Sequence, residues 1–189
     1  MRLLLVRHGE TDWNKMGKIQ GSTDTDLNQA GRMQSKELGI RLNGDEFSIR
    51  KVFTSPQKRA AQTAEIIAEI IGKDCEIVPG LEELNLGVFE GLNWDEVKQQ
   101  HPVSYSLFKQ DRRHAKIPQG ESYQLMLDRV IPALKYIIEQ DQDESLIVTH
   151  SAVIRAILTY IADIAFEEMM QFQVGNTSVT EVDSSELKL

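Results

Sequence analysis

Four side chains in this sequence have the chemistry to bind and transform an anion together: Arg7, His8, Arg59 and His150. Guanidinium groups bind phosphate oxygens through paired hydrogen bonds. A neutral imidazole near pH 7 is a nucleophile towards phosphorus, and an imidazole also carries protons. If folding brings these four side chains together, we expect them to form an anion site, most naturally one for a phosphoryl group.

Short apolar runs explain how the chain would bring the four together. These runs are Leu3–Val6, Leu146–Thr149 and Lys51–Phe53. The first ends at Arg7 and His8, the second at His150, and the third leads into a helix that carries Arg59. Runs of this length are typical of strands buried on both faces, and parallel sheets bind ligands beyond the carboxyl ends of their strands. We therefore expect one shared crevice.

Between these runs, apolar residues recur at helical spacing. The clearest helix is predicted over Pro56–Ile71, with Ser55 as its N-cap. Further helices are predicted over Gln29–Leu42, from about Trp94, and over Ser122–Gln140, Val153–Tyr160 and Phe166–Phe172, with strands near Glu76–Val78 and Ser178–Val182. This alternation predicts an α/β fold, a three-layer α/β/α sandwich with a mostly parallel central sheet.

Length and composition predict one domain over residues 1–189. The chain has 189 residues and 41% hydrophobic content, which is enough for one sizeable core. The segment at about 98–121 mixes aromatic, basic and turn residues without clean periodicity. We expect it to form a lid or an inserted loop over the site.

The net charge of −8 argues against general binding to nucleic acid or to anionic membranes, because both favour basic surfaces. No charged leader precedes an apolar segment and no apolar run approaches membrane-spanning length, so we expect a cytoplasmic protein. Its only cysteine, Cys75, excludes an internal disulfide. Carboxylates and histidines are not at metal-ligand spacings, so no metal and no cofactor are expected.

Four segments, in order along the chain, resemble the histidine phosphatase superfamily, also called the phosphoglycerate-mutase-like family. They are Arg7–Thr11 with Asn14, Gln20 and Gly21; Ser55–Ala64; Leu81–Gly91; and Val148–His150 with Val153–Ala156. The resemblance covers residue 2 to about residue 156. The chain departs from it at Ser151 and Ala152, where glycines often follow the histidine. A phosphoglycerate-mutase-like fold is what this resemblance implies.

Each catalytic position has a physical reason besides the resemblance. We assign His8 as the nucleophile, and Arg7, Arg59 and His150 as donors to the equatorial oxygens of the transferring phosphoryl group, with His150 donating as imidazolium. A leaving alkoxide needs a proton, and one carboxyl group can supply it. Two candidates adjoin, Glu82 and Glu83. The family motif places the acid four residues before Gly87, so the resemblance favours Glu83 and leaves Glu82 to solvent or a supporting pair.

Six further residues are candidates for substrate binding: Thr11, Asn14, Gln20, Gly21, Arg112 and Arg113. The resemblance includes Asn14, whereas Thr11 has the alternative of capping the next turn. Arg112 and Arg113 resemble a double-arginine segment that grips substrate in the mutases. A solvated basic loop is the alternative for these two arginines.

These assignments predict an enzyme, a phosphoric monoester hydrolase that splits small phosphomonoesters through a phosphohistidine at His8. The alternative is a mutase that returns the phosphoryl group to a bound phosphoglycerate. A third hypothesis is a non-catalytic phospholigand-binding module, which would have lost a catalytic group. The expected partner is a small phosphorylated metabolite, with its identity open, and a homodimer is left open as well.

Overall fold

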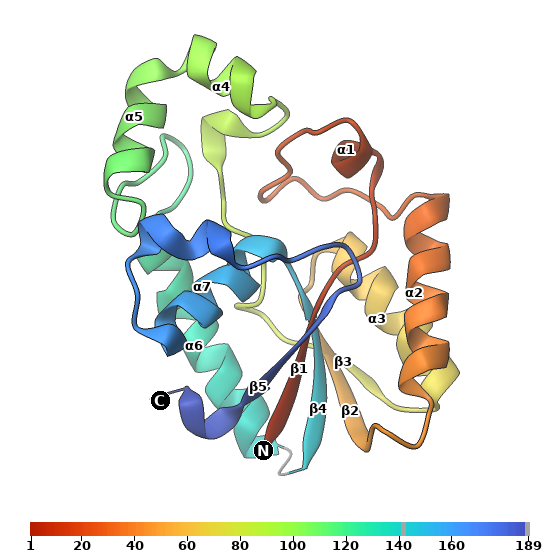
Figure 1. Cartoon of the computed structure of the whole chain (residues 1–189). Coiled ribbons are helices and arrows are strands. Elements are labelled where there is room, and N and C mark those ends of the chain that lie inside the picture. Colours follow the sequence, from red (N-terminus) through yellow and green to blue (C-terminus); the bar gives the residue numbers. More distant parts are fainter. Residues whose placement is uncertain (141–142, 188–189) are drawn as a thin grey trace.

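The computed structural model describes residues 1–140 and 143–187. Within these residues five strands form one sheet in the order β3-β2-β4-β1-β5 (Figure 1). Their bounds are β1 Arg2–Arg7, β2 Ile49–Thr54, β3 Cys75–Ile77, β4 Glu144–Thr149 and β5 Val179–Asp183. All neighbouring strands pair in parallel except β1 and β5, which are antiparallel. The mostly parallel sheet is confirmed.

Helices cover both faces of the sheet, so the three-layer prediction is confirmed (Figure 1). The α-helices are α1 Asp12–Lys15, α2 Gln29–Leu42, α3 Lys58–Ile71, α4 Trp94–Gln100, α5 Pro102–Gln110, α6 Tyr123–Gln140 and α7 Ser151–Ala162. The 3-10 helices are η1 Gly87–Phe89, η2 Phe166–Gln171 and η3 Ser184–Glu186. Helices α2 and α3 pack on one face, and α6 and α7 on the other.

Strand β1 is buried on both faces. Leu4 and Val6 belong to the core cluster that includes α2 and α3, whereas Leu3 and Leu5 belong to the cluster that includes α6 and α7. All four are at most 1% exposed. Successive strand residues point to opposite faces, so β1 is held from both sides and its carboxyl end is a fixed platform.

The helix that carries Arg59 begins later than predicted. Helix α3 starts at Lys58 with Gln57 at its N-cap, and no side chain caps it. Ser55, the predicted cap, accepts at its Oγ from the N–H of Gln57 at 3.3 Å and also forms a hydrogen bond between its Oγ and His150 Nε2 at 2.8 Å. Its hydroxyl therefore lies just before the helix and links it to His150, at the end of a neighbouring strand.

The segment at about 98–121 contains a helix that the sequence pattern missed. Helix α5 follows α4 directly, and we call residues 94–110 the cap because they stand above the carboxyl ends of the strands (Figure 1). On α5, Val103 is 72% and Leu107 is 56% exposed, while Phe108 is buried. Apolar residues on both sides of the helix hide the 3.6-residue period. The helix predicted near Phe166–Phe172 is the 3-10 helix η2.

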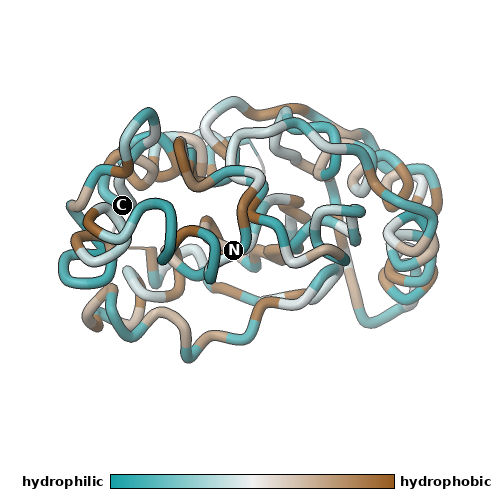
Figure 2. The backbone as a smooth tube through the Cα atoms, turned by 90° about the horizontal axis from the view of Figure 1, so that it is seen from above, coloured by the Kyte–Doolittle hydropathy of each residue, from teal (hydrophilic) through white to brown (hydrophobic). Residues whose placement is uncertain are grey.

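Apolar and polar stretches alternate at short intervals along the backbone (Figure 2). Among the described residues, no helix is long and apolar enough to cross a membrane.

Candidate active site

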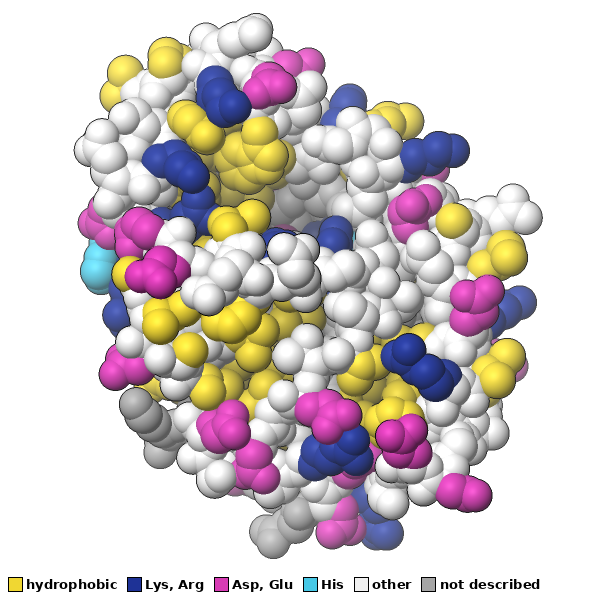
Figure 3. Space-filling model, in the orientation of Figure 1, with side chains coloured by type: hydrophobic (Ala, Val, Ile, Leu, Met, Phe, Trp, Pro, Cys, Tyr) yellow, Lys and Arg dark blue, Asp and Glu magenta, His cyan; other side chains and the backbone are white. Residues whose placement is uncertain are grey.

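A cavity of about 400 Å³ lies beyond the carboxyl end of β1. We call Arg7, His8 and Arg59 the floor of the cavity. Arg7 is the last residue of β1, His8 follows it, and Arg59 lies on α3, so the floor carries two cationic side chains. The wall of the cavity on the cap side carries the aromatic residues Trp94, Tyr105 and Phe108. Figure 3 shows this hollow between the cap and the region of α1, with apolar side chains on the cap side and cationic side chains deep inside.

The imidazole of His8 is held in one tautomer. Its Nδ1 lies 2.7 Å from the carbonyl oxygen of Gly9, so Nδ1 carries the proton and donates it to that oxygen. Its Nε2 accepts a hydrogen bond from Arg59 Nε at 3.3 Å. The lone pair of Nε2 therefore points towards the guanidinium that we expect to hold the phosphoryl group.

Burial also keeps His8 neutral. Its side chain is 2% exposed, and desolvation together with the charges of Arg59 and Arg7 lowers its pKa well below the ordinary value of 6.5. Gly9 is needed for a close approach of backbones, since a Cβ there would lie 2.6 Å from the carbonyl oxygen of Gly31 on α2. The unprotonated imidazole required of a nucleophile is thus the resting form.

The two arginines of the floor are fixed by backbone carbonyls. Arg59 is fully buried and donates from Nη1 to Thr23 O at 2.8 Å and from Nη2 to Gly21 O at 2.9 Å. Arg7 donates from Nη1 to Val174 O at 2.8 Å. Burial lowers the pKa of both guanidiniums, and the charge of Glu83 opposes this. Guanidinium groups stay charged in proteins, so both remain cations.

His150 lies beside the nucleophile, with ring centroids 5.2 Å apart. The side chain is fully buried, and desolvation with the charge of Arg59 lowers its pKa well below 6.5. The neutral imidazole is therefore favoured over the expected imidazolium, because burial and neighbouring cations disfavour a further positive charge. Bound phosphate would reverse that preference.

Three buried nitrogens at or near the cavity have no hydrogen-bond partner among the described residues. They are Arg7 Nε, His150 Nδ1 and Arg112 Nε. Buried polar atoms are normally paired, so unpaired nitrogens around a cavity indicate that a ligand completes them. An anion with several oxygens suits the two guanidinium donors.

Glu83 is the carboxylate that lines the cavity. Its Oε1 accepts from Leu84 N at 3.0 Å and its Oε2 from Ala152 N at 3.3 Å, in the first turn of α7. The adjacent Glu82 is engaged elsewhere, because its Oε2 accepts from Gly80 N at 2.7 Å and forms an ion pair with Arg129 at 3.4 Å. Of the two adjacent carboxylates, Glu83 alone is placed to meet a substrate.

Asn14 and Thr11 form a hydrogen-bonded unit at the start of α1. Asn14 Oδ1 accepts from Thr11 N at 3.2 Å and from Asn176 Nδ2 at 3.3 Å. These donors orient the amide of Asn14, which lines the cavity, so that its NH₂ group is free to donate to a ligand. Thr11 is fully buried and caps α1 instead of lining the cavity.

The sequence analysis missed Asn176, which also donates from Nδ2 to His8 O at 2.9 Å. It lies 168 residues from His8 along the chain, and no local pattern marks it. Gln20 and Gly21, both predicted, line the cavity. Gln20 Oε1 accepts from Thr11 Oγ1 at 2.9 Å, and the Gly21 carbonyl anchors Arg59.

The two predicted arginines after α5 lie in different surroundings. Arg112 lines the cavity, is 6% exposed and lies over the ring of Phe108 at 5.2 Å. Arg113 does not line it, since its Nε donates to Gln124 Oε1 at 2.8 Å and its guanidinium lies over Phe166. The structure therefore brings Arg112, and not Arg113, to the site.

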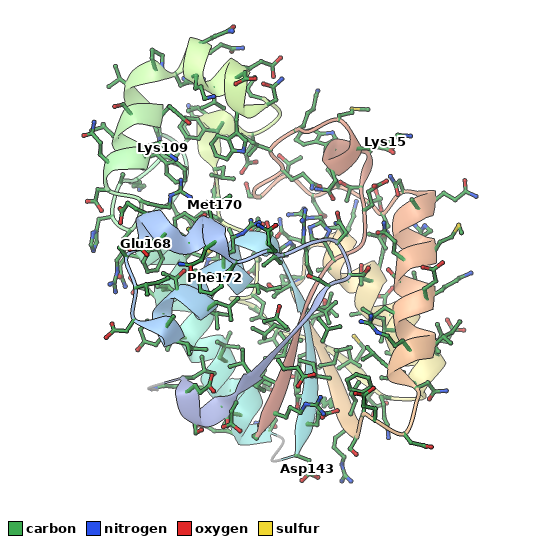
Figure 4. The ribbon with its side chains drawn as sticks, viewed as in Figure 1. Lys15, Lys109, Asp143, Glu168, Met170 and Phe172 are labelled. Atoms are coloured by element: carbon green, nitrogen blue, oxygen red, sulfur yellow. The ribbon has the colours of Figure 1, made fainter. Side chains whose placement is uncertain are left out.

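Other residues of the cavity wall were not among the predicted site residues. They include Lys18, Lys109, Tyr123, Ser151, Arg155 and Met170. Arg155 donates from Nε to Phe172 O at 3.1 Å, which leaves the rest of its guanidinium for the cavity. Lys109 on α5 and Met170 on η2 lie on the cap side, whereas Lys15 lies across from them on α1 (Figure 4). Arg155 belongs to a segment quoted for the resemblance, and that signal could have identified it.

Comparison with known proteins decides the family. Residues 3–188 match the model of the histidine phosphatase superfamily (branch 1). The chain belongs to the histidine phosphatase superfamily. The resemblance noted in the sequence is thereby confirmed over nearly the whole chain, well beyond residue 156.

Relatives of this chain include proteins named as phosphatases and proteins named as mutases. A metal-independent phosphoserine phosphatase of Arabidopsis thaliana is 40% identical over 162 residues, which is 82% of this chain and 66% of that protein. A probable phosphoglycerate mutase, GpmB, of Escherichia fergusonii is 32% identical over 98% of this chain and 86% of its own. The chain thus spans slightly under two thirds of the first relative and most of the second.

A solved structure, Bacillus stearothermophilus YhfR, has a TM-score of 0.86 at 30% identity, covering 96% of this chain and 90% of its own. Its similarity supports the phosphoglycerate-mutase-like arrangement described above. The names of the two relatives thus include one phosphatase and one mutase.

Proposed function

We propose that this chain is a cofactor-independent phosphatase that hydrolyses small phosphomonoesters through a phosphohistidine at His8. The observation that carries this proposal is the state of His8: one tautomer, neutral, with Nε2 beside a buried guanidinium at the floor of a cavity. We further propose that a single domain over residues 1–189 carries the activity and that the cap, with the rest of the segment at about 98–121, serves as its lid.

In the first step, the phosphoryl oxygens accept hydrogen bonds from the remaining N–H groups of Arg7, Arg59, Asn14 and His150. His8 Nε2 forms a bond to phosphorus while the bond from phosphorus to the ester oxygen breaks. The carboxyl group of Glu83 gives a proton to the departing alkoxide. Fixed cations suit this step, because charge spreads over the three equatorial oxygens in the transition state and no groups must reorganise.

In the second step, water attacks the phosphohistidine. The carboxylate of Glu83 takes a proton from the attacking water as the new oxygen–phosphorus bond forms. The nitrogen–phosphorus bond breaks and its electron pair returns to Nε2 of His8. Inorganic phosphate leaves, and both His8 and Glu83 recover their starting protonation.

A mutase is the second candidate, favoured by one observation. Arg112 is nearly buried in the cavity wall with Nε unpaired, and such a group suits a second anionic group on the substrate, as in a phosphoglycerate. The name of the relative from Escherichia fergusonii agrees with this candidate. Chemistry at His8 is the same in both cases, so the fate of the phosphoryl group separates them.

The test is a phosphate-release assay in excess EDTA with p-nitrophenyl phosphate, phosphoserine and 3-phosphoglycerate, with phosphoglycerate also checked for isomerisation. We expect release that resists EDTA and falls by about three orders of magnitude or more in His8→Ala. His114→Ala is the matched control, since His114 is exposed and does not line the cavity. Isomerisation faster than release would make the chain a mutase. Absence of both activities would favour the binding module.

A further inference from the structure

We propose that Arg129 is a positioning residue that holds Glu83 in the position from which its carboxyl group can protonate the leaving group. This proposal rests on the proposed role of Glu83 as the acid. Arg129 lies on α6, outside the cavity lining, and its side chain is 28% exposed. Its hydrogen bonds go to the segment of residues 80–83 and to Glu121, and its charge is also one of several that lower the pKa of His150.

Arg129 binds three backbone carbonyls of that segment. Its Nη1 donates to Gly80 O at 2.9 Å and to Glu82 O at 2.8 Å, and its Nη2 donates to Glu83 O at 3.0 Å. Glu82 adds a carboxylate contact to Nη1 at 3.4 Å. The planar, rigid guanidinium fork defines the direction of several bonds at once, so it fixes orientation as well as position.

Glu121 extends this arrangement to the other side of the acid. Its carboxylate binds Arg129 Nη2 at 2.6 Å and also accepts from Asn85 N at 2.9 Å. The backbone of Glu121 pairs as well, since its N–H donates to Asn85 O at 2.9 Å. Residues on both sides of Glu83 are therefore tied to one guanidinium–carboxylate pair.

The carboxyl group of Glu83 depends on this support. Among the described residues, the hydrogen bonds to this carboxyl group come from the backbone N–H groups of Leu84 and Ala152. Gly80 packs tightly on α6, since a Cβ there would lie 2.7 Å from the carbonyl oxygen of Arg129. The segment is thus held against α6 by both the side chain and the backbone of Arg129. This contact acts on the placement of Glu83 together with the hydrogen bonds from Glu83 N to Gln57 Oε1 at 2.7 Å and from Thr149 Oγ1 to Leu81 O at 2.7 Å.

A displaced acid has a specific kinetic signature. The value of kcat/KM covers the steps up to release of the alcohol, and only a poor leaving group needs the proton from Glu83 in those steps. A misplacement near 1 Å costs on the order of 10²-fold. A merely structural loss would lower kcat/KM for all esters alike.

The experiment compares kcat/KM for an alkyl ester, phosphoserine, with that for p-nitrophenyl phosphate in Arg129→Gln and Arg129→Lys. For Arg129→Gln we expect a loss of about 10²-fold on phosphoserine and a change of less than about threefold on p-nitrophenyl phosphate. Arg129→Lys should recover part of the loss, because it restores the charge and some donors but not the fork. Lys135→Gln, which removes an exposed cation from the same helix, should match the wild type.

The outcomes separate this proposal from the one it rests on. Equal losses on both esters in Arg129→Gln, or no loss on either, overturn the positioning role, provided that Glu83→Gln shows the dependence on leaving group. If Glu83→Gln itself lacks that dependence, the role of Glu83 as acid fails first. Glu121→Gln should show the same dependence on leaving group as Arg129→Gln, but a smaller loss. If the ratio of kcat/KM for p-nitrophenyl phosphate to kcat/KM for phosphoserine is unchanged in Arg129→Gln, Arg129→Lys and Glu121→Gln, the proposal is also overturned.

Discussion

The floor of the cavity and its cap-side wall hold their charged groups in different ways. On the floor, Arg59 is fully buried and two backbone carbonyls fix its guanidinium. On the wall, Lys109 is exposed, and the guanidinium of Arg112 lies over the ring of Phe108. The floor is preorganised by the sheet and α3, whereas these two wall residues lie on α5 and just after it.

We expect the floor to serve the chemical step and the wall to serve substrate selectivity. A transition state gains most from donors that need no reorganisation, which describes the floor. Recognition of the rest of a substrate tolerates adjustable side chains, which describes the wall. Substitutions on the floor should therefore lower kcat/KM for every substrate, and substitutions on the wall should change the ranking of substrates.

The largest expected effect is at Arg59. Arg59→Lys keeps a positive charge but loses the fork that bonds Gly21 O, Thr23 O and His8 together. We expect kcat/KM to fall by about 10²–10³-fold for aryl and alkyl esters alike. Arg32→Lys, an exposed change on α2, is the control. A loss below about tenfold, or one confined to some substrates, would remove the distinction between floor and wall.

The next effect is on stability and arises from the two buried histidines. Desolvation and nearby guanidiniums lower the pKa of His8 and His150 well below 6.5. As pH falls below 6.5, His8 and His150 bind protons in the unfolded chain but stay neutral in the folded chain. The free energy of unfolding therefore decreases as pH decreases. Each histidine contributes up to about 1.4 kcal/mol for each pH unit between the unfolded and folded pKa values, and nothing to the slope above 6.5.

Urea unfolding between about pH 7.5 and about pH 5.5 measures this slope. His150→Ala should lose a substantial part of this slope, whereas His114→Ala, which changes an exposed histidine, should keep it. An unchanged slope in His150→Ala would show that burial and the nearby guanidiniums do not hold His150 neutral.

The smallest expected effect is at the wall. Arg112→Gln should raise KM by about tenfold for phosphoserine and 3-phosphoglycerate, because a charged hydrogen bond to their second anionic group is lost. KM for p-nitrophenyl phosphate and kcat for all three should change little. Arg113→Gln is the matched control, since Arg113 bonds Gln124 away from the cavity. If the two variants behave alike, Arg112 does not select substrates.

The strand ends were predictable because two independent signals agree there. An apolar run that stops at Arg7 and His8 predicts a buried strand with a reactive end, and the family resemblance names the same residues. Sheet order and the antiparallel direction of β5 were not predicted, because alternation of apolar residues is the same in either direction.

The supporting residues escaped prediction because their contacts are distant in the chain. Ser55 meets His150 across 95 residues, and Asn176 meets His8 across 168. In the sequence, Arg129 is an ordinary charged residue of an amphipathic helix. Only the tertiary structure shows that it binds the carbonyl oxygens of Gly80 and Glu82. Local spacing carries no information on such pairs, whereas tertiary structure supplies it directly.

The most direct test of the account is to find where the phosphoryl group resides during turnover. Wild type and Glu83→Gln would be quenched in alkali within one turnover of p-nitrophenyl phosphate, and the phosphorylated peptide identified by mass spectrometry. We predict phosphohistidine at His8 in both proteins, with more of it in Glu83→Gln because its hydrolysis lacks a base. Phosphate on His150, or turnover without a phosphoenzyme in either protein, would contradict the account.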